Sequence, residues 1–251
     1  RQNKRQALID AGQMPYGHRF DFSAHAEDLH EKYADLENGE ITEDGVEIAG
    51  RIMAKRGQGK LTFLEISDNG TVIQIFCRIN DLGEDAYEQV KDLDIGDWIA
   101  VSGFVMRARR GALSVLAKKV ELMSKALRPL PEKFHGLEDK ELRYRQRYVD
   151  LIVNNDVRET FEKRAKIVQA IPKYMAQRGY LEFETPFLHQ IVGGANAEPF
   201  VTKHNALDRE FYLRIATELY LKRLIVGGFD RVYEMGRQFR NEGMDHYHNP
   251  E

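Results

Sequence analysis

The residues best suited to chemistry lie in a polar stretch at residues 237–251, RQFRNEGMDHYHNPE. Arg240 carries a planar guanidinium that can hold two oxygen atoms at once and neutralise negative charge, as a phosphate or carboxylate requires. Glu242 follows two positions later, and His248 and Asn249 add a ring nitrogen and an amide. The stretch therefore indicates either an active-site loop or a solvated loop in which Arg240 and Glu242 form a surface ion pair.

The composition is that of a globular protein. The chain has 251 residues, of which 42% are hydrophobic and 31% charged, enough for one large or two ordinary domains. A net charge of −3 excludes a generally basic surface but allows a local basic patch. The single cysteine, Cys77, cannot form an internal disulfide, so we expect a reducing, cytoplasmic setting without a membrane span. Because the chain runs from Arg1 to Glu251 and ends inside the polar stretch, we expect a segment of a longer polypeptide.

Residues 1–40 are predicted to form an N-terminal helical extension. One helix is expected at 1–12 and a second at 23–36, with Ser23 as its N-cap and apolar residues at helical spacing. The extension can be an arm that touches a partner, or a pair of helices that caps the next domain. We favour the capping interpretation, because helical extensions usually pack.

Residues 41–124 are predicted to form an all-β barrel. The hydrophobic period changes to two, and Asn69-Gly70 is typical of a tight hairpin. A helix is expected at 81–93, between the third and fourth strands. The expected strands lie at residues 46–55, 60–67, 71–78, 97–107 and 112–122. Five strands with a helix in this place are typical of an OB-fold.

Alternation assigns a side of the barrel to each residue of strands two and three. The four inward residues are Leu64, Ile66, Ile73 and Ile75. Phe63, Gln74 and Phe76 fall on the outer side, which in OB-folds binds oligonucleotides. A basic stripe at residues 104–119 lies nearby in the sequence. The pattern leaves two possibilities open: a nucleic-acid face, or an outer face in which the N-terminal helices cover Phe63.

Residues 125–147 are predicted to be a linker, and residues 148–251 a second, α+β domain. It begins with a long helix at 156–177, in which Pro172 predicts a bend. Short strands near 199–203, 211–215 and 231–236 and a helix at 218–226 follow. The connections suit an antiparallel sheet, which we expect to be incomplete at residue 251.

Four segments carry a resemblance to a known family. Residues 125–137 and 143–151 are similar to class II lysyl-tRNA synthetases of the bacterial type, residues 179–186 resemble class II motif 1, and residues 239–251 resemble the first part of motif 2. The resemblance extends over essentially the whole chain. It implies a multidomain protein: an OB-fold anticodon-binding domain behind N-terminal helices, then an incomplete catalytic domain of the class II α+β fold.

The resemblance also implies roles in the catalytic domain. Arg240 would bind the α-phosphate of ATP and the substrate carboxylate, and Glu242, His248 and Asn249 would contact the nucleotide. Gly194, through its backbone, and Glu218 would hold the α-ammonium of lysine, since a carboxylate pairs well with a primary ammonium. From the residues alone, Glu218 is equally a first-turn charge that stabilises a helix.

In the barrel, the resemblance implies anticodon binding. Phe63 and Gln74 would stack on and hydrogen-bond to the central uridine of tRNA(Lys), with Lys55 beside them. Two positions depart from the family. Lys55 stands where an arginine is familiar, which removes bidentate contact. Ala112 replaces a glutamate, so recognition of the third base is in question.

The implied function is that of a lysine–tRNA ligase, which uses ATP to form lysyl-adenylate and transfers lysine to tRNA. Mg²⁺ would assist the reaction of ATP, with its ligands expected outside these 251 residues and none within them. Motif 1 would form the interface of a homodimer. Motif 3 is absent from the 251 residues, so this segment alone is expected to be inactive. The alternatives are an aspartyl- or asparaginyl-type synthetase, against which residues 125–137 argue, and a non-catalytic RNA-binding module.

Overall fold

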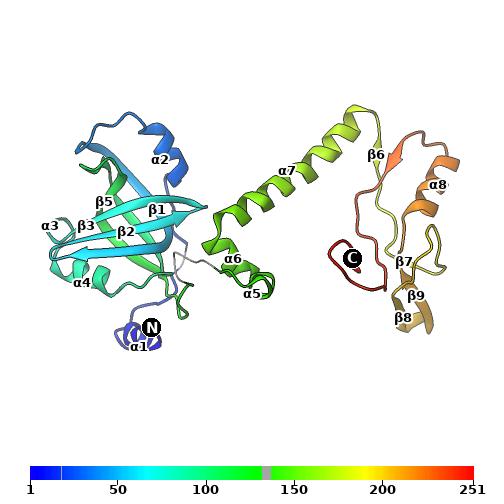
Figure 1. The fold of residues 1–251 in the computed structure, drawn as a ribbon, viewed down its shortest axis with the longest axis horizontal. Coiled ribbons are helices and arrows are strands. Elements are labelled where there is room, and N and C mark those ends of the chain that lie inside the picture. The colour runs from blue at the N-terminus through cyan, green and yellow to red at the C-terminus, as the bar shows by residue number, and fades with distance from the viewer. Residues whose placement is uncertain (18, 132–136) are drawn as a thin grey trace. The chain divides into compact units, whose positions relative to one another are not determined.

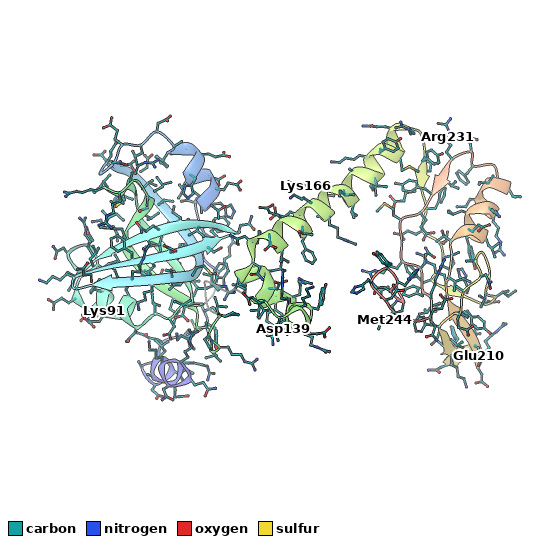
Figure 2. All side chains as sticks on the ribbon, viewed as in Figure 1. Lys91, Asp139, Lys166, Glu210, Arg231 and Met244 are labelled. Atoms are coloured by element: carbon teal, nitrogen blue, oxygen red, sulfur yellow. The ribbon has the colours of Figure 1, made fainter. Side chains whose placement is uncertain are left out.

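The structure, a computed structural model, describes residues 1–17, 19–131 and 137–251 (Figure 1). Figure 2 adds their side chains. Residues 132–136 of the predicted linker, and of the first segment that resembles the synthetases, lie outside the described residues. The chain divides into two compact units, Arg1–Glu159 and Thr160–Glu251.

The first unit contains the predicted five-stranded barrel. The strands are β1 (Ile41–Gln58), β2 (Leu61–Asp68), β3 (Thr71–Arg78), β4 (Trp98–Arg107) and β5 (Leu113–Ser124). The barrel closes in the order β1-β2-β3-β5-β4, with β3 and β5 parallel and the other pairs antiparallel. Two short helices, α3 (Ile79–Leu82) and α4 (Glu84–Asp92), replace the single helix predicted between β3 and β4. Gly83 separates them with a φ of +85°, which is outside the helical region.

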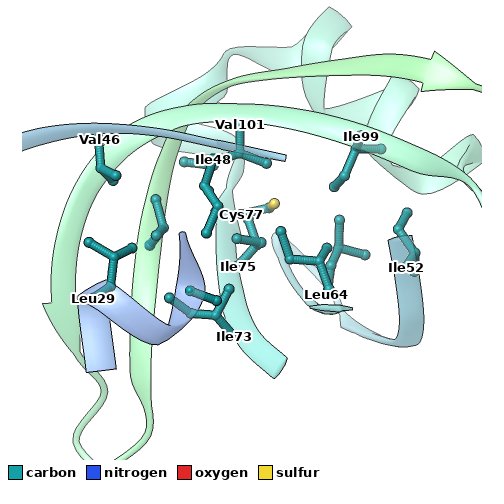
Figure 3. Packing of buried hydrophobic residues seen from close by; sticks show 14 of the residues in the cluster. Leu29, Val46, Ile48, Ile52, Leu64, Ile73, Ile75, Cys77, Ile99 and Val101 are labelled. Atoms are coloured by element: carbon teal, nitrogen blue, oxygen red, sulfur yellow. The ribbon is translucent and has the colours of Figure 1, made fainter. Parts of the chain in front are cut away.

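The barrel core confirms the side assignment made from alternation. Leu64, Ile66 and Ile75 are fully buried and Ile73 is 1% exposed. Figure 3 shows Leu64, Ile73 and Ile75 packed with labelled side chains of β1 and β4 inside the barrel. Cys77 lies in the same cluster, where burial raises the pKa of its thiol to about 12. A thiol with so high a pKa is not a nucleophile near neutral pH.

The N-terminal helices are α1 (Gln2–Asp10) and α2 (Ala26–Lys32). The second begins later than predicted, and its N-cap is His25 rather than Ser23. The carboxylate of Asp28 accepts the backbone N–H of His25 at 3.1 Å, whereas Ser23 exchanges hydrogen bonds with the backbone of Glu47 in β1. The α2 helix places Ala26 and Leu29 in the barrel core, which supports the capping interpretation of this helix.

Three helices follow the barrel: α5 (Lys140–Arg145), α6 (Arg147–Val153) and α7 (Asn155–Gln177). A fully buried carboxylate, Asp150, joins α5 to α6: it accepts a hydrogen bond from Nε of Arg143 at 2.8 Å and pairs with Arg147. The α7 helix continues through Pro172 without interruption. Side chains project from both sides of α7 along its length (Figure 2).

The second unit has two small sheets. In one, β7 (Leu188–His189) and β8 (Val201–His204) flank β9 (Arg209–Leu213), all antiparallel as predicted. In the other, β6 (Leu181–Glu182) pairs with β10 (Val232–Tyr233) in parallel, contrary to the prediction of an antiparallel sheet.

The connection between β6 and β10 explains the parallel pairing. It contains the three-stranded sheet, the 3₁₀ turn Asn205–Leu207 and α8 (Glu218–Val226). A connection of this length can carry the chain back to the end of the sheet at which β6 begins, as a parallel pair requires. Within the described residues, no helix is both long and apolar enough to cross a membrane.

Candidate nucleic-acid interface and candidate active site

The outer face of β2 and β3 carries a hollow of about 890 Å³. Phe63 and Phe76, register partners on these strands, meet edge to face with ring centroids 4.9 Å apart at its wall. Gln74 lines the same hollow. The lining includes no residue of α1 or α2, both of which are fully described, so those helices do not cover Phe63. The structure thus brings Phe63 and Gln74 together on an open face.

Lys55 does not join them. Its ammonium donates to the carbonyl oxygens of Lys91 at 2.5 Å and Leu93 at 2.8 Å, at the end of α4. Burial lowers the pKa of this ammonium. A register shift between Ile52 and Ala54 in β1 contributes to this placement, because it changes which residue of β1 lies opposite each residue of β2.

Arg56 lies opposite Phe63 instead and lines the hollow. It is exposed and pairs with Glu65 at 2.7 Å. The sequence analysis missed Arg56. Alternation along β1 alone could not identify it, because the shift at Ile52 is visible only once the two strands are paired.

The basic stripe predicted at residues 104–119 is not continuous. Arg107 donates to the carbonyl oxygens of Tyr33 at 2.7 Å and Ala34 at 2.8 Å. Two lysines of the stripe pair with carboxylates, Lys118 with Asp81 and Lys119 with Glu121. Arg109 and Arg110 are exposed and line the hollow, together with Ala112. The positive charge beside Phe63 therefore comes from a few arginines rather than from the whole stripe.

In the second unit, the structure brings Gly194 and Glu218 together. Gly194 has a φ of +90°, and a Cβ added to it would lie 3.4 Å from the Cβ of Glu218 and 3.1 Å from that of Ala216. Glu218 is the first residue of α8 and forms an ion pair with Lys222 one turn later. The backbone of Gly194 thus lies beside the Cβ of Glu218, a residue whose carboxylate can pair with an ammonium group.

The remaining predicted residues lie in the irregular segment after β10. The strand expected at 231–236 is limited to Val232–Tyr233, so Arg240 and Glu242 do not share a strand face. The backbone N–H of Arg240 donates to Pro250 at 2.8 Å, and its side chain is exposed. The carboxylate of Glu242 accepts the backbone N–H of Glu198 at 3.1 Å.

His248 and Asn249 are exposed in the same segment. Nδ1 of His248 lies 2.8 Å from the carboxylate of Asp245, whose pKa is lowered mainly by the backbone N–H of Tyr247. Among the described residues, no hydrogen bond or ion pair links Arg240 to Gly194 or Glu218. The predicted residues of this unit therefore lie in two groups, Gly194 with Glu218 and the segment that contains Arg240.

A buried arginine, Arg214, organises the segment that precedes Arg240. Its Nη1 donates to the carbonyl and hydroxyl oxygens of Thr185 at 3.2 and 3.3 Å, and it pairs with Glu234. Its Nε donates to the carbonyl of Arg237 at 2.9 Å, and its guanidinium lies 3.9 Å from the ring centre of Phe187. The sequence analysis missed this group, because a buried arginine and an exposed one look alike in a sequence.

The Glu234 carboxylate is ionised in this network. Burial acts to raise its pKa, but hydrogen bonds from Thr185 and Arg214 outweigh burial and lower it. No cluster of three or more His, Cys, Asp or Glu side chains suited to a metal ion occurs in the part of the chain that the structure describes.

Both parts of the chain are similar to known proteins. Residues 46–123 match an OB-fold nucleic acid binding domain, and residues 139–251 match the class II tRNA synthetases (D, K and N). Lysine–tRNA ligases of Pelotomaculum thermopropionicum and Carboxydothermus hydrogenoformans are each 53% identical over 251 residues, which cover 100% of this chain and 49% and 50% of those proteins. The enzyme of Pediococcus pentosaceus is 52% identical over 253 residues, covering 100% of this chain and 51% of that protein.

The chain spans about half the length of these relatives. The similarity nevertheless extends over all of this chain, including the barrel, the helices after it and the segment around Arg240. The closed barrel with an aromatic outer face fits the first matched domain, and the mixed helix and strand unit fits the second. On these grounds, the whole chain is similar to lysine–tRNA ligases, and residues 139–251 are similar to the class II tRNA synthetases.

Proposed function

We propose that this chain acts as part of a lysine–tRNA ligase. The enzyme would join lysine to ATP, release pyrophosphate, and transfer the lysyl group from lysyl-adenylate to tRNA(Lys). The observation that supports this most is the similarity of the whole chain to lysine–tRNA ligases at 52–53% identity. These relatives are named lysine–tRNA ligases, which favours lysine over aspartate or asparagine as the substrate. Their similarity includes the synthetase-like residues 139–251 as well as the barrel, which favours an enzyme over an isolated RNA-binding module.

In the proposed activation step, Glu218 binds the α-ammonium of lysine and the backbone of Gly194 borders it. Their closeness, 3.4 Å between the Glu218 Cβ and a Cβ placed on Gly194, supports this assignment. Arg240 would hold the α-phosphate of ATP and the lysine carboxylate, and neutralise charge at phosphorus during in-line attack. Glu242, His248 and Asn249 would contact the nucleotide. ATP is a substrate, and Mg²⁺ would neutralise its phosphates when bound.

The barrel is proposed to bind the anticodon of tRNA(Lys). Phe63 would stack on the central base and Gln74 would hydrogen-bond to it, since aromatic stacking on single-stranded bases contributes about 1–3 kcal/mol each. The open hollow with both residues in its wall supports this proposal. For Lys55, whose ammonium binds carbonyls of α4, a contact with RNA would require that it leave them.

Motif 1 is proposed to form a homodimer interface through α7. Ile167 and Ile171 of this helix are 63% and 41% exposed, and apolar side chains exposed along a helix are typical of an interaction surface. Sedimentation of the full-length polypeptide would test the dimer. A cytoplasmic location is proposed because charging of tRNA takes place there.

The test of the enzyme is ATP–pyrophosphate exchange by the full-length polypeptide with each amino acid in turn. We expect exchange that depends on lysine, and Glu218→Gln should abolish it by removing the partner of the ammonium. Glu210→Gln, an exposed carboxylate in β9, is the matched control and should retain exchange. Exchange with aspartate or asparagine in place of lysine would contradict the proposal, and so would exchange with none.

A further inference from the structure

Ser114 of β5 lies directly beside Gln74 on the barrel. The two residues are register partners in the parallel pair of β3 and β5, so their side chains lie on the same side of the sheet. Gln74 is half-buried and lines the hollow, whereas Ser114 is fully buried. The hydroxyl Oγ of Ser114 lies 3.0 Å from Oε1 of Gln74.

The single hydrogen of this hydroxyl can serve one acceptor at a time. Two acceptors are in reach: Oε1 of Gln74 at 3.0 Å and the carbonyl of Ala112 at 3.2 Å. The Ala112 carbonyl already accepts the backbone N–H of Ala108 at 2.8 Å. Because the contact with Gln74 is the shorter one and the Ala112 carbonyl already has a donor, we assign the hydrogen to Gln74, where it holds Oε1 against the barrel wall.

With Oε1 held, the amide nitrogen Nε2 of Gln74 is the group left for a ligand. Among the described residues it has no hydrogen-bond partner, and its side chain borders the hollow beside Phe63. An amide nitrogen can only donate. The group that Gln74 offers to a base is thus a donor of fixed orientation.

We propose that Ser114 is a positioning residue that fixes the Gln74 amide with its nitrogen outward, and so makes the hollow select uracil over cytosine. Uracil presents an acceptor oxygen at position 4, where cytosine presents an amino donor. A donor of fixed orientation can hydrogen-bond to the uracil oxygen but not to the cytosine amino group, which is itself a donor. An amide that can rotate to present either its nitrogen or its oxygen can hydrogen-bond to both bases. The inference rests on the proposed binding of the anticodon by the barrel.

The experiment measures binding of the 251-residue chain to two anticodon stem-loop RNAs that differ only in uracil or cytosine at the central position. Fluorescence anisotropy gives both affinities, and their ratio is the readout. We expect the unmodified chain to prefer uracil by roughly tenfold, as one good base contact provides. Ser114→Ala should bring the ratio close to one by improving cytosine binding, with little change for uracil. Ser102→Ala, a serine of β4 that does not line the hollow, should leave the ratio unchanged.

Two variants of Gln74 complete the test. Gln74→Glu replaces the outward donor by an acceptor, and it should reverse the preference toward cytosine. In a Gln74→Ala background, Ser114→Ala should have no further effect on the ratio, because the group that it positions is gone. Unfolding midpoints of all variants exclude loss of the fold.

The outcomes separate the inference from the function on which it rests. Failure of the unmodified chain to bind either RNA would overturn both. Binding with a cytosine preference would mean the opposite amide orientation and overturn the role of Ser114 alone. An equal loss for both RNAs in Ser114→Ala, or the same loss in the Gln74→Ala background, would show a merely structural serine and overturn it as well.

Discussion

The barrel and the second unit differ in the number and the kind of side chains that they bury. The barrel closes its hydrogen bonds on itself, and its strands share one cluster of fully buried residues such as Ile48 and Ile75. Among the described residues of Thr160–Glu251, the buried side chains are few and mostly polar. They are Phe211, Ile215, Thr185, His189 and Arg214.

This difference matches the state of the two sites. In the barrel, Phe63 and Gln74 lie on the paired strands β2 and β3 and line one hollow. In the second unit, Gly194 and Glu218 meet, but Arg240 lies in an irregular segment without a strand to fix it. A site can be only as well ordered as the elements that carry it.

The largest effect is expected in the second unit, from Arg214→Met. The change leaves the nearly buried Glu234 carboxylate unpaired, which typically costs about 3–5 kcal/mol. Hydrogen exchange should show lost protection in residues 160–251, with the barrel unchanged as an internal reference. Adding Glu234→Gln removes the unpaired charge and should restore part of the protection. Equal protection in Arg214→Met and the unmodified chain would show that this network does not hold the unit together.

A similar but smaller loss is expected in the barrel from Ile75→Ala. Ile75 is fully buried, so its truncation should lower the free energy of unfolding by about 2–5 kcal/mol. Val72→Ala is the matched control on the same strand, because Val72 is 43% exposed and lies on the other side. Urea denaturation measures both. If the two changes cost the same, the division of β3 into inner and outer sides is wrong.

The RNA face is tested by Phe63→Ala. Loss of one stacking ring should weaken binding of an anticodon stem-loop by about 1–3 kcal/mol without changing stability to a similar degree. Phe22→Ala, another half-exposed aromatic of the first unit that does not line the hollow, should bind normally. Unchanged affinity for Phe63→Ala would place RNA elsewhere on the barrel.

The choice between Arg56 and Lys55 is tested through salt dependence. Arg56 lines the hollow, so Arg56→Ala should lower the slope of log K against log salt concentration by roughly 0.7 for one lost phosphate contact with single-stranded RNA. Lys55→Ala is the comparison on the same strand and should leave the slope unchanged, because its ammonium binds carbonyls of α4. A lower slope for Lys55→Ala would support the role predicted for it from the sequence.

The smallest effect is expected from pH, at the Asp94 carboxylate beside the barrel. Burial acts to raise its pKa, but hydrogen bonds from Lys125 at 2.5 Å and Lys4 at 3.2 Å outweigh burial and lower it. A lowered pKa stabilises the fold above the unfolded-state pKa of about 3.9, and this contribution is lost as the pH falls through the folded-state value. The melting temperature, measured from roughly pH 6 down to roughly pH 3, should fall as this contribution is lost. Asp94→Asn should reduce it, and an unchanged pH dependence would contradict the assignment.

Much of the barrel could be predicted from the sequence because its determinants are local. The alternation of Leu64, Ile66, Ile73 and Ile75 and the turn at Asn69 depend on neighbours in the chain. The second unit was predicted less well, because its parallel pair, β6 with β10, joins segments about 50 residues apart whose alternation does not reveal direction. The site residues divide in the same way: Phe63 and Gln74 follow from alternation, while Gly194 and Glu218 were implied only by family resemblance.

The sequence alone determined the inner and outer sides of β2 and β3 and the resemblance to the class II lysyl-tRNA synthetases, because both depend on residue type and spacing along the chain. Tertiary structure alone decided which charges are available to a ligand. Lys55 donates to carbonyl oxygens at the end of α4, Arg107 donates to carbonyl oxygens just after α2, and Arg214 pairs with a buried carboxylate. A charged side chain is free or occupied according to its neighbours in space, and strand register and packing determine those neighbours.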